Sequence, residues 1–143
     1  EYAEVFVPAG DGKTSFVDAR DIGAVAAVVL TQSGHENRAY DLTGPEAIDY
    51  GAVATVFSDV LDRPITYPRP SLLEFGWRMR QRGRSVGFIL LMGVIYTTAR
   101  LGLADRVTGD TERILDREPR RMRDFVEDHA SEFRTGSDPP ATS

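Results

Sequence analysis

One stretch of the sequence, residues 14–26, constrains the fold more than any other. Ser15-Phe16-Val17 is typical of a strand, and Asp18 follows where it can cap a helix. Asp21 adds a second acid in the first turn, where the helix dipole favours negative charge. Four apolar residues then recur at the spacing of one buried helical face: Ile22, Val25, Ala26 and Val29. The stretch therefore predicts a strand that runs straight into a helix.

The rest of the sequence predicts an α/β fold whose second half is helical. A second strand is expected over residues 39–43, where it stops at Gly44-Pro45, and a third over residues 65–67. We expect about three short strands in all and five to six helices. The helices are predicted after Asp18, after Asp49, from Ser71 to about Arg82, over residues 86–101, from Asp110 to Leu115, and over residues 122–133.

Composition limits what the chain can do. The 143 residues carry a formal net charge of −5, which argues against nucleic acid as the main partner. There is no cysteine, so disulfides and thiolate metal sites are excluded. We expect residues 1–133 to form the folded portion and residues 134–143, rich in Pro, Ser and Thr, to be a disordered tail.

The longest apolar run, Val86 to Tyr96, is 11 residues long, well short of the ~20 residues that a membrane helix needs. A buried or interface helix is the better interpretation, and no membrane span is expected. We expect the chain to form a homo-oligomer through the apolar helix 86–101. The N-terminal residues lack the basic and apolar regions of a secretory signal, and we expect a cytoplasmic location.

Few residues offer recognisable chemistry. Neither a G-x-G-x-x-G nor a G-x-x-x-x-G-K pattern is present, and Gly10-Asp11-Gly12-Lys13 is better interpreted as a hairpin turn than as a phosphate loop. No tyrosine has a lysine four residues later. Tyr96 has Arg100 there, but arginine does not titrate usefully. The only histidines, His35 and His129, are far apart, so a zinc site is not expected.

Charged residues leave alternatives open. Asp18 and Asp21 could form a carboxylate pair for acid–base chemistry, but their position favours helix capping. Two arginine clusters could bind nucleic acid or other anions, but a solvated helix face paired with Asp124, Glu127 and Asp128 is favoured. These clusters are Arg78, Arg80, Arg82 and Arg84, and Arg117, Arg120, Arg121 and Arg123.

Several segments, taken in order, resemble the C-terminal half of NmrA-like proteins, which are atypical short-chain dehydrogenases/reductases. The matching segments are residues 16–26, 40–48, 61–65, 117–120, 124–126 and 129–130. The resemblance extends over roughly residues 2–133. It rests on the order and spacing of the segments, because no single motif is diagnostic.

The resemblance implies a Rossmann-like fold of which this chain is the C-terminal portion, with NAD or NADP bound by an N-terminal half that is absent here. Family members reduce quinones, azo compounds and related small molecules. Other members sense the NADP/NAD balance or bind partner proteins without turnover, and one relative is an accessory subunit of respiratory complex I. An independent helical binding domain is a third interpretation, which rests on helix 86–96.

The leading hypothesis is that the chain is the substrate-side portion of an NAD(P)-dependent oxidoreductase. Alone, it is expected neither to bind NAD(P) tightly nor to catalyse the reaction. No catalytic residue of the family can be placed on this sequence. The residues expected to face a substrate pocket are Asp18 and Arg20, at the strand-to-helix turn, and the aromatic residues Tyr67 and Trp77.

Overall fold

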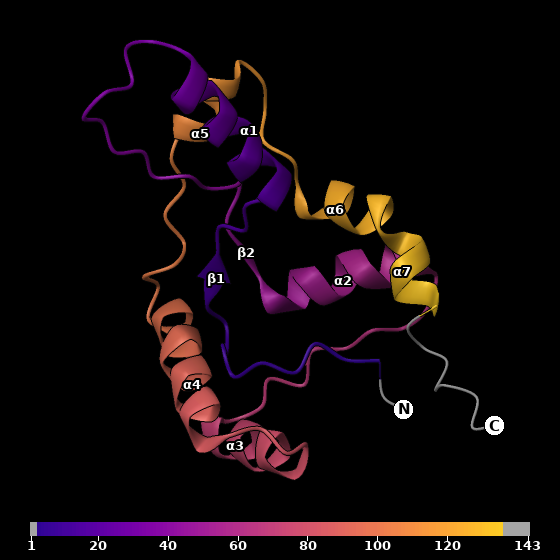
Figure 1. Cartoon of the computed structure of the whole chain (residues 1–143). Helices are drawn as coiled ribbons and strands as arrows, with labels where there is room; N and C mark the ends of the chain where they lie inside the picture. Colours follow the sequence, from indigo (N-terminus) through magenta and orange to yellow (C-terminus); the bar gives the residue numbers. More distant parts are fainter. Residues whose placement is uncertain (1–2, 136–143) are drawn as a thin grey trace, which may run out of the picture.

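The computed structural model describes residues 3–135 (Figure 1). Within that range the chain forms seven helices and one two-stranded sheet. The elements, in order, are β1 (Lys13–Thr14), α1 (Ala19–Thr31), β2 (Ile48–Asp49), α2 (Tyr50–Leu61), α3 (Leu72–Gln81), α4 (Val86–Arg100), α5 (Asp110–Leu115), α6 (Met122–Asp128) and α7 (Ala130–Thr135). This mixed composition, helical in its second half, confirms the predicted α/β class.

The helices pack in three groups around the small sheet (Figure 1). Helix α1 packs on α5, α2 packs on α6 and α7, and α3 packs on α4. Segments far apart in the sequence therefore lie side by side, because the last helices return to the first two. The turn between β1 and α1 lies where the first two groups meet (Figure 1).

Local capping explains why most helices begin where the sequence predicts. The Asp18 carboxylate accepts a hydrogen bond from the Arg20 N–H at 2.8 Å, and the Asp49 carboxylate accepts one from the Ala52 N–H at 2.8 Å. Ser71 and Glu74 form both halves of a capping box. The favoured interpretation of Asp18 as a helix cap is therefore confirmed.

The strands differ from the prediction. Among residues 3–135, β1 pairs antiparallel with β2, and parallel pairing is confined to a single bridge between Glu4 and Thr66. Residues 39–43, predicted as a strand, are not one, because their backbone groups bond to side chains of the loop before α5 and of the first residue of α5. The Asp41 N–H donates to the Asp110 carboxylate at 2.9 Å, and the Asp41 carbonyl accepts from the Thr108 hydroxyl.

The final predicted helix is divided at His129. The His129 ring donates a hydrogen bond from Nδ1 to the Phe125 carbonyl at 2.8 Å, and its backbone N–H donates to the same oxygen at 3.2 Å. α6 ends at Asp128 and α7 begins at Ala130, which gives seven helices in residues 3–135 in place of the five to six predicted. Of the tail predicted over residues 134–143, Arg134 lies in α7, and residues 136–143 lie outside the described residues.

An aromatic cluster around Tyr50 joins the groups. The Tyr50 ring lies 5.6 Å from the Phe16 ring, 5.9 Å from Tyr67 and 6.0 Å from Tyr96, measured between centroids. Such pairs contribute about 0.5–1.5 kcal/mol each beyond their buried area. Because the four rings come from the turn before α1, from α2, from the segment after α2 and from α4, the cluster fixes the turn that leads into α1.

Candidate functional site

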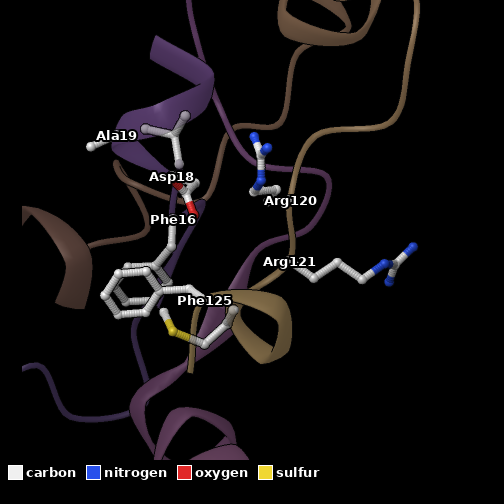
Figure 2. Close-up of a pocket in the computed structure, with 8 residues that line it drawn as sticks. Phe16, Asp18, Ala19, Arg120, Arg121 and Phe125 are labelled. Carbon is white, nitrogen blue, oxygen red and sulfur yellow. The ribbon is translucent and has the colours of Figure 1, made fainter. Parts of the chain in front are cut away.

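A cavity of about 280 Å³ opens beside the turn that leads into α1 (Figure 2). One wall comes from this turn and the first residue of α1, and the other from the loop before α6 and α6 itself. The lining residues are Phe16, Val17, Asp18, Ala19, Arg120, Arg121, Met122 and Phe125. The two walls are about a hundred residues apart in the sequence.

The lining is mainly apolar. Phe16, Val17, Met122 and Phe125 supply aromatic, branched and thioether side chains, whereas the charged groups are confined to Asp18, Arg120 and Arg121. Arg121 extends away from the other labelled side chains (Figure 2). An apolar cavity with few polar groups is the ordinary form of a small-molecule site.

Asp18 is held in one position at the cavity wall. Its side chain is only 4% exposed and accepts hydrogen bonds from the Arg20 guanidinium, at 3.0 Å from Nε and 2.7 Å from Nη2. These bonds and the arginine charge lower the pKa of Asp18 below its usual value, although burial opposes the shift. The carboxylate is therefore anionic, and Arg20 already neutralises it.

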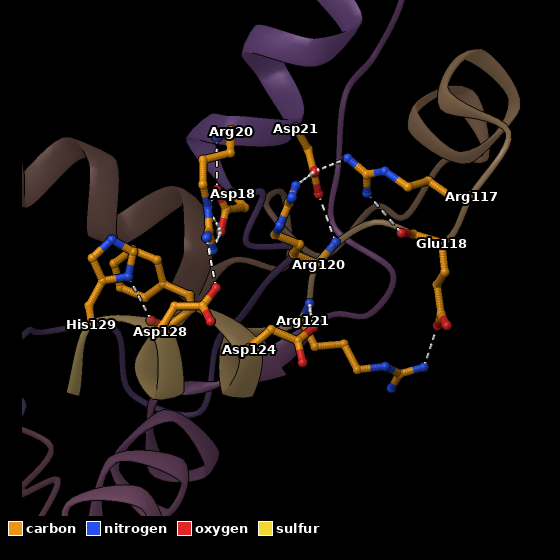
Figure 3. A network of polar contacts seen from close by, with 11 residues as sticks. Asp18, Arg20, Asp21, Arg117, Glu118, Arg120, Arg121, Asp124, Asp128 and His129 are labelled. Carbon is orange, nitrogen blue, oxygen red and sulfur yellow. Dashed lines mark hydrogen bonds and ion pairs between the residues drawn. The ribbon is translucent and has the colours of Figure 1, made fainter.

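Arg20 also connects two helices. Its Nη1 donates to the Asp128 carboxylate on α6 at 2.7 Å, while its other nitrogens hold Asp18 (Figure 3). Both carboxylates raise the pKa of Arg20, so the guanidinium stays charged. The structure thus brings two of the predicted pocket residues together, but the Arg20 side chain spans from α1 to α6 and is not part of the cavity lining.

Asp21 is the central charge of the region, a role that neither the favoured capping interpretation nor the acid–base alternative predicted. Its carboxylate is fully buried and accepts hydrogen bonds from Arg117 Nη2 at 2.7 Å, from the Arg120 N–H at 2.7 Å and from the Arg120 guanidinium (Figure 3). Burial alone would raise the pKa of Asp21, but these donors outweigh it and lower the pKa. The position of Asp21 four residues before Val25, on the buried helical face, indicates a buried role.

The second arginine cluster is only in part the solvated helix face that the sequence predicts: Arg123 pairs with Glu127, but Arg117 and Arg120 do not pair with acids of α6. Arg117 and Arg120 bind Asp21, which lies on a different helix, because the loop between α5 and α6 passes over the start of α1. Arg123 bridges to Asp59 on α2 at 2.9 Å and reaches Glu127 at 3.9 Å. The cluster therefore connects helices to one another.

The predicted aromatic pocket residues lie elsewhere. The Tyr67 hydroxyl donates to the carbonyls of Val7 and Gly10, each at 3.1 Å, and burial raises the Tyr67 pKa. Trp77 lies on α3 and is 68% exposed. Neither residue lines the cavity beside α1, so the structure does not bring Tyr67 and Trp77 together with Asp18.

Within residues 3–135, no group of three or more His, Asp or Glu side chains is placed to hold a metal ion. His35 instead contacts the Tyr40 hydroxyl at 2.7 Å. No described helix combines the length and apolar character needed to cross a bilayer.

Comparison with known proteins identifies the relatives of the chain. It is 35% identical over 133 residues to the NAD(P)H azoreductase of Xenophilus azovorans, which covers 93% of this chain and 46% of the azoreductase. The chain spans about half the length of the curated relatives it matches. No protein-family profile matches the sequence.

Solved structures show the same fold. A triphenylmethane reductase from Citrobacter sp. matches with a TM-score of 0.82 and 22% identity, over 90% of this chain and 45% of the reductase. An NADPH-dependent quinone oxidoreductase from Escherichia coli, solved with NADPH, also matches with a TM-score of 0.82 and 22% identity, over 91% of this chain and 45% of that structure.

These matches define the class of protein. The chain has the fold of the C-terminal part of Rossmann-like reductases. More particularly, it is homologous to NmrA-like atypical short-chain dehydrogenases/reductases, which confirms the family resemblance found in its sequence.

Proposed function

We propose that this chain forms the substrate-side wall of an NAD(P)-dependent oxidoreductase that reduces a small, largely apolar molecule. The cavity between the start of α1 and α6 carries the proposal. Its lining combines two phenylalanines and a methionine with a carboxylate that Arg20 has already neutralised. Such a lining favours a flat, uncharged ring system over a strongly charged substrate.

The relatives support a redox role for the whole protein. One is named for azo reduction and another for quinone reduction, and both names specify a nicotinamide cofactor. Azo compounds and quinones are flat and conjugated, which matches the aromatic lining of the cavity. On this proposal the cavity residues bind and orient the substrate, and the cofactor supplies hydride from outside this chain.

The described helix starts do not fit the pyrophosphate of a dinucleotide. A pyrophosphate needs free backbone N–H groups at the positive end of a helix. Asp18 and Asp21 occupy that position on α1, Asp49 on α2 and Glu74 on α3. Ser85 caps α4 without a glycine-rich turn. We therefore propose that other segments of the enzyme bind the nucleotide, and that this chain alone is not catalytic.

Calorimetry on the 143-residue chain tests this assignment. A small quinone such as naphthoquinone should bind, and NADPH should give no saturable heat. Phe125→Ala should weaken quinone binding because it removes an aromatic wall of the cavity, and Phe57→Ala, which removes a ring packed on Phe133 outside the cavity, is the control. Micromolar binding of NADPH to the chain would refute the proposal.

A second candidate function is a non-catalytic NAD(P)-sensing or protein-interaction module of the same family, comparable to an accessory subunit of complex I. The observation that favours it is the exposed apolar surface of α3 and α4, which suits a protein contact better than turnover. Full-length enzyme that binds NADPH but shows no reductase activity towards azo compounds or quinones would favour this alternative.

A further inference from the structure

Phe125 is the aromatic residue of α6 that lines the cavity, and two more rings that follow it in the chain pack against it. The His129 ring lies 4.6 Å from the Phe125 ring, measured between centroids, and is tilted from it by 31°. The Phe133 ring lies at 6.2 Å and 64°. The shorter distance and the smaller tilt indicate that His129 covers one side of the Phe125 ring, while another side faces the cavity.

The His129 side chain is held in place by a hydrogen bond. Its ring Nδ1 donates to the Phe125 carbonyl at 2.8 Å, and its backbone N–H donates to the same oxygen at 3.2 Å. A side chain with two torsions has little freedom left once its ring nitrogen is bonded. The residue that ends α6 is therefore also the residue whose ring packs on a cavity wall (Figure 3).

The His129 side chain is not part of the cavity lining, to which α6 contributes Met122 and Phe125. Any effect of His129 on a molecule in the cavity therefore passes through Phe125. A phenylalanine on a helix has two common χ1 rotamers. The His129 ring lies four residues later on the same side of the helix, and it stabilises the rotamer in which the two rings are in contact.

The end of α6 is also held by contacts that do not involve the His129 ring. Asp128, the residue before His129, accepts a hydrogen bond from Arg20 Nη1 at 2.7 Å, which ties α6 to α1 (Figure 3). In α7, Phe133 packs on Phe57 of α2 at 5.0 Å between ring centroids. A substitution of His129 therefore removes its own ring and hydrogen bond without releasing α6 from the neighbouring helices.

We propose that His129 is a positioning residue for the substrate: it holds the Phe125 ring in the orientation that forms the aromatic wall of the cavity. This role rests on the proposed function, in which the cavity binds a flat ring system. A wall that is already ordered costs a ligand less on binding than a wall that the ligand must immobilise. The stabilisation supplied by one aromatic pair corresponds to roughly a three- to ten-fold change in Kd.

Two substitutions of His129 separate its ring from its hydrogen bond. Asparagine keeps an N–H donor but has no ring, whereas phenylalanine keeps a ring but has no donor. In calorimetry with naphthoquinone, His129→Asn should raise Kd roughly three- to ten-fold, and His129→Phe should restore the wild-type value. If His129 acted only by ending α6, His129→Asn would behave as wild type and His129→Phe would not. His35→Asn is the matched control, because His35 contacts Tyr40 outside the cavity lining, and it should leave Kd unchanged.

Nuclear magnetic resonance of the Phe125 side chain tests the positioning role without a ligand. The χ1 couplings should report one rotamer in the wild-type chain and in His129→Phe, and an average of two in His129→Asn. One rotamer in all three proteins would overturn the inference, as would an unchanged Kd in His129→Asn when Phe125→Ala weakens naphthoquinone binding. Averaging in His129→Asn, combined with a Kd that neither His129→Asn nor Phe125→Ala changes, would overturn the proposed function and with it the substrate role of His129.

Discussion

Substitution of Asp21 by asparagine tests whether one buried carboxylate holds the two walls of the cavity together. Asp21 is fully buried and accepts from Arg117 Nη2, from the Arg120 N–H and from the Arg120 guanidinium. Asparagine keeps the shape of the side chain but removes its charge, and it replaces one acceptor oxygen with a donor that faces the arginines. The substitution therefore weakens the contact between α1 and the loop before α6.

The loss of stability expected for Asp21→Asn follows from the hydrogen bonds that Asp21 makes with Arg117 and Arg120. A hydrogen bond to a charged group contributes about 1.5–3 kcal/mol, and loss of one partner from a buried pair costs about 3–5 kcal/mol. The side chains of Arg117 and Arg120 are 40% and 34% exposed, so water can replace part of what they lose. We therefore expect Asp21→Asn to lower the free energy of unfolding by about 2–3 kcal/mol. In a chain of this length that loss lowers Tm by roughly 6–10 °C.

Urea denaturation at several pH values provides the assay. Because the folded-state pKa of Asp21 lies below the unfolded value, its contribution is complete above the unfolded pKa and is lost as the pH falls through the folded pKa. The difference between wild type and Asp21→Asn should therefore be largest near neutral pH and should shrink in acid. Asp59→Asn, which breaks the exposed pair with Arg123, is the matched control and should cost less than about 1 kcal/mol. Equal losses of unfolding free energy in Asp21→Asn and Asp59→Asn would refute the claim that the buried Asp21 carboxylate holds the two cavity walls together.

Other substitutions have defined outcomes. Gly44→Ala should destabilise the chain strongly in thermal melts, because the added Cβ would lie 1.9 Å from the Phe16 carbonyl oxygen. Tyr67→Phe should cost about 1 kcal/mol in urea denaturation, since it leaves the Val7 and Gly10 carbonyls without their donor. Ser71→Ala should cost about 1 kcal/mol through loss of the capping box, and Ser71→Asp should restore most of it. No measurable effect of Gly44→Ala would contradict the close packing of these two backbone segments.

Local rules in the sequence predict the helices well. Asp18, Asp49 and Ser71 each bond to a backbone N–H within three residues, so the information that starts these helices is contained in a few neighbouring positions. The strands are harder to predict, because the backbone of Asp41 finds its partners in the loop before α5 and at the start of α5, more than sixty residues later. A β-forming composition alone does not reveal such a competing partner.

The cavity is also only partly predictable from the sequence, because its two walls come from distant segments. Asp18 was predictable because it lies at a strand-to-helix turn, a common place for functional residues. The opposite wall, Met122 and Phe125, is brought there by the bonds of Asp21 to Arg117 and Arg120, which are 96 and 99 residues away. Trp77 looks like a pocket residue by composition, yet α3 turns it towards solvent. Whether an aromatic residue such as Phe125 or Trp77 lines the cavity or faces solvent is decided by tertiary packing, which the local sequence does not reveal.

A chimeric reductase tests most directly the proposal that this chain binds the substrate while other segments of the enzyme bind the nucleotide. The corresponding half of the Xenophilus azovorans NAD(P)H azoreductase would be replaced by this chain, and NADPH-dependent azo reduction would be measured with and without Phe125→Ala. Phe125→Ala should raise KM for the azo substrate and leave KM for NADPH unchanged, because Phe125 lines the cavity proposed to bind the substrate. A raised KM for NADPH with an unchanged KM for the azo compound would contradict it.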